Sequence, residues 1–153
     1  MGEIVIRQAG DADMQRLMEL RSVWTREWHG DADDPGYAER FAAWFERESG
    51  RRLTWLAEAD GRAIGMMNLA VFERMPSPGR EPGCWGYLGN AFVLAEFRDQ
   101  GVGQMLIDAL LHYADDNGFA RVVLSPSERS VPFYERNGFR PADALLLRRL
   151  PAK

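Results

Sequence analysis

The stretch FVLAEFRDQGVG, residues 92–103, carries the strongest structural signal in the chain. Phe92 and Val93 are typical of a β-strand, and a helix with a broad apolar stripe is predicted to follow over 101–117. Gly101 and Gly103 stand where the turn enters that helix. The first amides of a helix have no intrahelical partner, and glycine lets the backbone close around an anion without interference from a Cβ. The stretch therefore predicts a diphosphate-binding turn, although a bare Gly-x-Gly is also typical of an ordinary sharp turn.

Two other phosphate-binding motifs do not fit this stretch. No Gly-Lys-Ser or Gly-Lys-Thr is present for a P-loop, and Leu106 stands where a dinucleotide fingerprint needs a third glycine.

On either side of this stretch, the chain predicts strands and helices in one mixed α/β unit. Helices are expected over 12–28 with Asp11 as N-cap, around an aromatic face at 37–45, and over 128–137 with Ser127 as N-cap. Strands are expected at 3–8, 53–59, 62–71, 87–94 and 121–124, and in two pieces over 139–150. The nearly all-apolar strand at 121–124 is typical of a sheet covered on both faces. No boundary divides the chain, so residues 1–153 are predicted to form a single domain.

Composition excludes several classes of protein. The chain has 153 residues, of which 46% are hydrophobic, and a net charge of 19 − 23 = −4, which argues against a dedicated nucleic-acid binder. The single cysteine, Cys84, excludes an internal disulfide and a multi-cysteine zinc site, and no metal is expected. No apolar run approaches the roughly 20 residues of a membrane helix, and no leader opens the chain. A cytoplasmic protein without a membrane partner is the expectation.

Two motifs together resemble a known family. Arg98-x-x-Gly101-x-Gly103, preceded by Phe92 and Val93, is similar to the acyl-CoA-binding motif of the GCN5-related N-acetyltransferases (GNAT). The segment SVPFYERNGF, residues 130–139, is similar to that family's second signature. The resemblance is specific over about 85–140 and architectural elsewhere. It implies a single-domain α/β fold with a mixed, mostly antiparallel sheet, flanked by helices and with splayed central strands.

The resemblance also implies acetyl-CoA as cosubstrate. The pantetheine arm would lie between the strand of Phe92 and Val93 and the strand at 122–124, and an amide near Val93 would stabilise the oxyanion. The amides of 100–104 would bind the diphosphate, with Arg98 shaping the loop. The cofactor-binding candidates are Phe92, Val93, Arg98, Asp99, Gln100, Gly101, Val102, Gly103, Gln104, Ser130 and Phe133. Asp99 replaces a frequent glycine of the family and Gln104 a frequent basic residue.

Tyr134 is the candidate general acid, because a phenol can protonate the departing thiolate. The alternative is that Tyr134 only caps the core. Since adjacent helical residues point about 100° apart, Phe133 is expected to pack inward while Tyr134 faces the cofactor. Glu96 and Glu73 are candidate bases, and neither is assigned. The amine would attack the thioester directly, without a covalent enzyme intermediate.

Several functions stay open. The favoured one is an N-acetyltransferase acting on a primary amine of a small molecule. The alternatives are a non-catalytic acyl-CoA sensor, a protein or peptide N-acetyltransferase, and a nucleotide-binding regulatory protein. The resemblance leaves a homodimer open.

The aromatic residues of the first two helices are expected in the core, with one or two lining the acceptor pocket: Trp24, Trp28, Tyr37, Trp44 and Phe45. Asp31, Asp33 and Asp34 are expected in a solvated loop, with attraction of a cationic amine as a weaker alternative.

Overall fold

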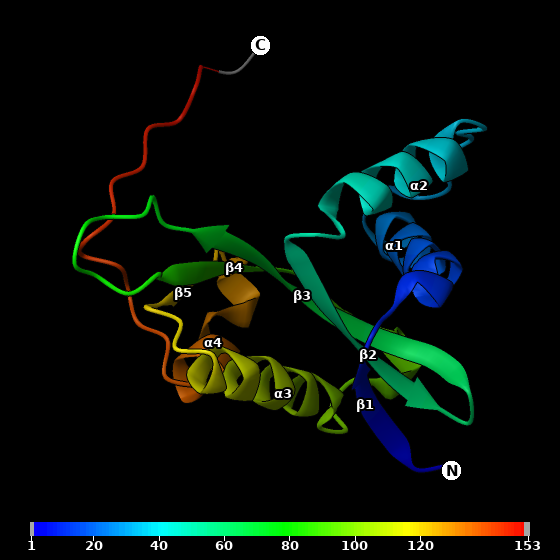
Figure 1. The fold of residues 1–153 in the computed structure, drawn as a ribbon. Helices are drawn as coiled ribbons and strands as arrows, with labels where there is room; N and C mark the ends of the chain where they lie inside the picture. The colour runs from blue at the N-terminus through cyan, green and yellow to red at the C-terminus, as the bar shows by residue number, and fades with distance from the viewer. Residues whose placement is uncertain (1, 152–153) are drawn as a thin grey trace.

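The computed structural model describes residues 2–151 and has one open five-stranded sheet (Figure 1). The strands lie in chain order and are β1 (Ile4–Gln8), β2 (Arg52–Ala59), β3 (Arg62–Glu73), β4 (Cys84–Val93) and β5 (Val122–Val123). β1 to β4 pair antiparallel, and β5 runs parallel to β4. The predicted fold class, a mostly antiparallel sheet flanked by helices, is confirmed.

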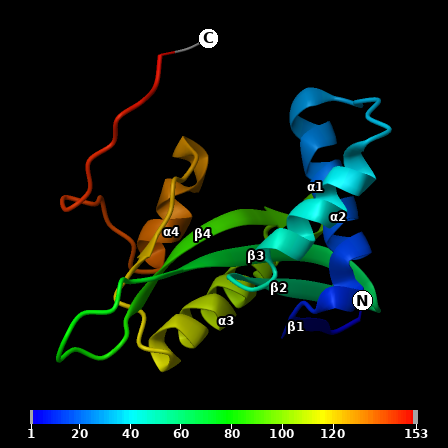
Figure 2. The ribbon, with the colours of Figure 1, turned by 45° about the horizontal axis from the view of Figure 1, so that its top comes forward.

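Helices cover both faces of the sheet (Figures 1 and 2). α1 (Met14–His29) and α2 (Tyr37–Glu48) lie on one face, and α3 (Val102–Asp116) lies on the other, with α4 (Val131–Arg136) beside it. Three short 3-10 turns complete the structure: η1 (Asp11–Asp13), η2 (Ala95–Phe97) and η3 (Glu128–Ser130). The core contains buried side chains of α1, the sheet and α3: Leu17, Leu20, Leu56, Ile64, Leu69, Leu106, Ile107 and Leu110.

Two sheet predictions are wrong. β5 is a two-residue, half-buried edge strand, and residues 139–151 form no strand at all. Leu146 is fully exposed there, and the segment runs away from the body of the molecule (Figure 2). A strand needs a neighbouring edge for its amides and carbonyls. β5 offers only two residues of edge, and Pro141 lacks an amide donor.

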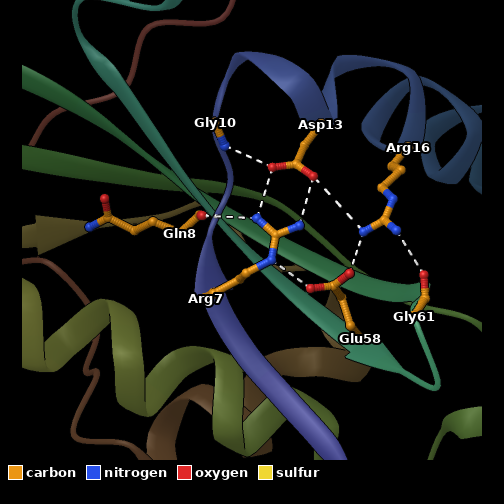
Figure 3. Close-up of polar contacts among 7 residues, drawn as sticks. All are labelled: Arg7, Gln8, Gly10, Asp13, Arg16, Glu58 and Gly61. Carbon is orange, nitrogen blue, oxygen red and sulfur yellow. Dashed lines mark hydrogen bonds and ion pairs between the residues drawn. The ribbon is translucent and has the colours of Figure 1, made fainter.

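An ion-pair cluster fixes the start of α1 against the sheet (Figure 3). Arg7 donates two hydrogen bonds to the Asp13 carboxylate, at 2.8 and 2.9 Å, and one to Glu58 at 2.5 Å. Arg16 donates to Glu58 and, at 2.7 Å, to the carbonyl of Gly61 in the β2–β3 turn. We expected Asp11 to cap the first helix, but Asp13 is the residue that accepts the Gly10 amide, at 2.8 Å. The cluster thereby holds the turn between β1 and α1 in place.

Acid should weaken this cluster through Asp13. Hydrogen bonds from Arg7 lower the pKa of the Asp13 carboxyl from 3.8 to about 2. A lowered pKa in the folded state gives stabilisation that is complete above pH 4 and is lost as the pH falls toward 2. Between pH 5 and pH 2, the free energy of unfolding should fall by about 2 kcal/mol more in the wild type than in Asp13→Asn. Guanidinium melts at each pH measure this difference, and parallel curves for the two proteins would contradict it. The exposed Asp11→Asn serves as the control.

Candidate active site

β4 and β5 separate soon after they meet. The two strands pair only at Gly86 with Val122 and at Tyr87 with Val123. From Leu88 to Val93, β4 has no strand on that side within residues 2–151. β4 and β5 therefore diverge along the second half of β4, as the splayed strands of the predicted fold require. We call the region beside this half of β4 the β4–β5 wedge.

The main-chain N–H and C=O groups of Val93 point toward the β4–β5 wedge. The amide of Leu94 donates to the carbonyl of Ile64 at 2.8 Å, which makes Gly65 and Val93 a non-hydrogen-bonded pair of the antiparallel ladder. In such a pair, the N–H and C=O of each residue point away from the partner strand. The Val93 carbonyl is taken by Arg98, whose Nε donates to it at 2.9 Å. The Val93 amide is left as a donor facing the wedge.

Phe92, the other predicted strand residue, does not face the wedge. It lies opposite Met66, at a hydrogen-bonded position of the β3–β4 ladder. Its buried side chain stacks under Trp24 of α1, with ring centroids 5.6 Å apart. Of the predicted pair, only Val93 offers a polar group to a ligand in the wedge.

The turn into α3 presents a row of amides without acceptors. Asp99 and Gly101 have left-handed backbones, with φ of 61° and 84°. The amides of residues 100–104 donate to no other group among the described residues. A Cβ on Gly103 would lie 3.7 Å from the Phe133 ring, so α4 packs beside this end of α3. Unpaired amides at the start of a helix suit an anion, and diphosphate binding here stays a prediction.

Three predicted cofactor-binding side chains are occupied by contacts within the protein. Arg98 pairs with Glu27 of α1 at 2.7 Å, which ties the loop to that helix. Gln104 exchanges amide hydrogen bonds of 2.7 and 3.2 Å with Asn137 at the end of α4. Ser130 donates to the carbonyl of Ser127 at 2.9 Å. Asp99 and Gln100 are exposed and Val102 is buried, so these positions offer main-chain groups rather than side chains to an anion on the turn.

The burial of Phe133 and Tyr134 is the reverse of the prediction. Tyr134 is only 8% exposed, whereas Phe133 is half-buried against the start of α3. The Tyr134 ring makes edge contacts with Phe133 and Phe139, at 5.1 and 5.7 Å between centroids. Burial raises the pKa of the Tyr134 phenol, so it is protonated at neutral pH. Its hydroxyl has no hydrogen-bond partner among residues 2–151.

A cavity of about 470 Å³ lies on the face of the sheet covered by α1 and α2. It reaches β4 at Asn90, where a bulge in the β3–β4 ladder gives this residue a φ of 51°. Four aromatic residues of α2 line it, namely Tyr37, Phe41, Trp44 and Phe45. Of the five aromatic residues expected in the core, with one or two at a pocket, three line this cavity, and Trp28 is 68% exposed and lies outside it. β4 thus borders both the cavity and the β4–β5 wedge.

Sequence reasoning missed the polar residues of this cavity. Arg21, Arg52 and Asn68 line it from α1, β2 and β3. No motif joins them, because they meet only through the fold.

Metal-ligand clusters and membrane-spanning helices were sought within residues 2–151. Residues 2–151 contain no group of three His, Cys, Asp or Glu side chains that could hold a metal ion. Within the same range, every helix is too short or too polar to cross a membrane.

Comparison with known proteins agrees with this geometry. The sequence model of the acetyltransferase (GNAT) family matches residues 17–139. A glucosamine 6-phosphate N-acetyltransferase from Trypanosoma brucei brucei is 34% identical over 80 residues, which is 52% of each protein. A mycothiol acetyltransferase from Rhodococcus jostii is 29% identical over 87% of this chain and 50% of that protein. This chain therefore spans about half the length of the curated relatives it matches.

Solved structures share the fold. The crystal structure of a predicted acetyltransferase with acetyl-CoA from Clostridium acetobutylicum superposes with a TM-score of 0.77, at 19% identity, over 96% of each chain. The family match over residues 17–139 covers most of the chain, with most of α1 and all of α2, α3, α4 and β2 to β5. The chain belongs to the acetyltransferase (GNAT) family.

Proposed function

We propose that the protein is an acetyl-CoA-dependent N-acetyltransferase that moves the acetyl group directly to a primary amine of a small molecule. The observation that carries the proposal is that two groups of main-chain amides donate to no described acceptor. The free amides at the start of α3 can bind a diphosphate, and the free amide of Val93 lies in the wedge beside them. A ligand with an anionic linker and a carbonyl at its far end fits these two groups of donors.

Each donor has a role in this proposal. The amides of residues 100–104 hold the diphosphate of acetyl-CoA, and Arg98 fixes the loop through Val93 and Glu27. The Val93 amide stabilises the oxyanion that forms when the amine attacks the thioester carbonyl. The neutral amine forms the new C–N bond as it attacks, and the C–S bond breaks when the oxyanion collapses. The neutral Tyr134 phenol donates its proton to the leaving sulfur. The proton of the amine passes to solvent, since we assign no base, and the Tyr134 phenolate takes a proton back from solvent.

The cavity on the α1–α2 face is proposed as the acceptor site. Its volume of about 470 Å³ suits a small molecule, and Asn90 brings it to β4. The names of two relatives, which refer to glucosamine 6-phosphate and mycothiol, support a small acceptor. A cytoplasmic location and a homodimer stay predictions, as does the single domain over 1–153. No nucleic acid, membrane or metal takes part in the proposed reaction.

Calorimetry and a thiol-release assay together test the proposal. Acetyl-CoA is expected to bind in preference to ATP or NAD, and CoA thiol should appear only when an amine is added. Binding without thiol release across an amine panel would support the acyl-CoA sensor instead. Preferential binding of ATP or NAD would support a nucleotide-binding regulator. Release of CoA thiol with peptides, but with no small amine, would support a protein N-acetyltransferase.

A further inference from the structure

The acceptor cavity is lined by more positively charged than negatively charged side chains. Three arginines line it, Arg21, Arg40 and Arg52, against two acids, Asp11 and Glu48. Arg40 is engaged by Asp34, and Arg52 pairs with Glu48 at 2.6 Å. Glu48 also pairs with Arg51 at 2.7 Å, so two cations share this one carboxylate.

Arg21 differs from the other two arginines. No carboxylate of residues 2–151 lies within ion-pair distance of its guanidinium. The guanidinium stacks instead on the Trp24 ring, 4.0 Å from its centroid, and Trp24 stacks on Phe92 of β4. Stacking occupies one face of the guanidinium and leaves its N–H edges free. Those edges match the two oxygens of a carboxylate or phosphate group.

Asn68 supplies a second donor to the cavity. It is 4% exposed, and its Oδ1 accepts a hydrogen bond from Arg52 at 3.1 Å. Its Nδ2 donates to no other side chain or carbonyl of the described residues. Because Asn68 lines the cavity, its Nδ2 is an unpaired donor that a ligand can satisfy.

Apolar side chains form much of the remaining wall. They come from α1, α2 and β3, and are Leu17, Phe41, Trp44, Phe45 and Met66. The acidic loop at 31–34, the alternative site of attraction for a cation, is partly neutralised, since Asp31 pairs with Arg26 at 3.0 Å and Asp34 with Arg40. The cavity therefore suits a ligand with an apolar body and an anionic group, and it disfavours a polycation.

We propose that the acceptor is a primary amine that also carries a carboxylate or phosphate group, and that Arg21 and Asn68 bind this group. The proposal rests on the proposed function and names the substrate class of the same site. The apolar body of the acceptor lies against the aromatic residues of α2, and its amine reaches β4 near Asn90. Arg21 is then a specificity-determining residue that takes no part in the chemistry.

Matched pairs of amines test the proposal. Phenylalanine against 2-phenylethylamine adds a carboxylate, and O-phosphoethanolamine against ethanolamine adds a phosphate. With saturating acetyl-CoA, the kcat/KM from thiol release should favour the anionic member of at least one pair by about tenfold or more. The pair that shows the preference identifies the anionic group.

Variants of α1 then assign the preference to Arg21. Arg21→Gln should lower the anionic-to-neutral ratio of kcat/KM by about tenfold to a hundredfold, whereas Arg21→Lys should retain most of it because the charge stays. Arg26→Gln makes the same charge change on α1 outside the cavity, and it should leave the ratio unaltered. Calorimetric binding of each amine to the protein with CoA gives a readout that does not need turnover.

The outcomes separate the two proposals. Binding of an anionic amine that depends on Arg21, without acetylation of any amine, would support the binding role of Arg21 and contradict the proposed function. Turnover of neutral amines at least as fast as anionic ones in both pairs would overturn the inference and leave the proposed function supported. An unchanged ratio in Arg21→Gln, or no binding of either anionic amine, would also overturn it.

Discussion

Replacing Gly103 with glutamate is expected to raise the KM for acetyl-CoA about a hundredfold without destabilising the fold. Gly103 is the second residue of α3, among amides that donate to no other described group. A carboxylate there would repel the diphosphate and compete with it for these donors, and charged hydrogen bonds of this kind contribute about 1.5–3 kcal/mol each. Such a loss corresponds to about a hundredfold in affinity. In the free protein, the same acid lies at a helix N-terminus, where negative charge is stabilising by about 0.3–1 kcal/mol.

Two further substitutions at Gly103 isolate the effect of charge. Gly103→Gln has nearly the same shape as the glutamate and should raise the KM only about tenfold or less. Gly103→Ala should behave almost as the wild type, since its Cβ would meet the Phe133 ring at an ordinary 3.7 Å. The measurements are the calorimetric Kd for acetyl-CoA, the KM and the melting temperature. Equal affinities of the glutamate and glutamine variants would show that the diphosphate does not bind at this end of α3.

Prediction from sequence was most accurate for the elements that residues close together in the chain specify. The turn at Asp60-Gly61 needs two positive φ angles, and the structure has 51° and 76° there. The helix predicted over 101–117 is α3, Val102–Asp116, because an apolar stripe and two flanking glycines specify both of its ends. The amides at its start follow from the helix itself, so this part of the candidate site was also predictable.

The features that sequence reasoning missed depend on distant segments. Whether 139–150 forms strands depends on an edge that β5, with two residues, does not offer. The burial of Tyr134 depends on contacts with Phe139 and the core, which helical spacing alone does not specify. Arg21 and Asn68 come to one cavity from different elements, and Arg21 is distinctive only because no carboxylate of the described chain lies within ion-pair distance of it.

Replacing Tyr134 with phenylalanine is expected to lower kcat about a hundredfold while the KM for acetyl-CoA changes little. A general acid typically contributes a factor of about 10² to 10⁴, and the thiolate of CoA is a leaving group that a neutral phenol can protonate. Burial raises the pKa of Tyr134, so the wild-type phenol keeps its proton across the neutral range. The hydroxyl bonds to no described residue, and its removal preserves the ring contacts with Phe133 and Phe139. The loss of rate should therefore come without a loss of stability.

Tyr113→Phe makes the same chemical change elsewhere in the molecule. The Tyr113 ring packs on Trp55 and Phe119 on the α3 side of the sheet, so this variant should keep the wild-type kcat. A thioester whose leaving thiol has a lower pKa offers a second readout, because a better leaving group needs less help from an acid. With that substrate, the difference between wild type and Tyr134→Phe should shrink, which a purely structural role of the hydroxyl would not cause. An unchanged kcat in Tyr134→Phe would remove the acid role and leave Tyr134 as a core residue.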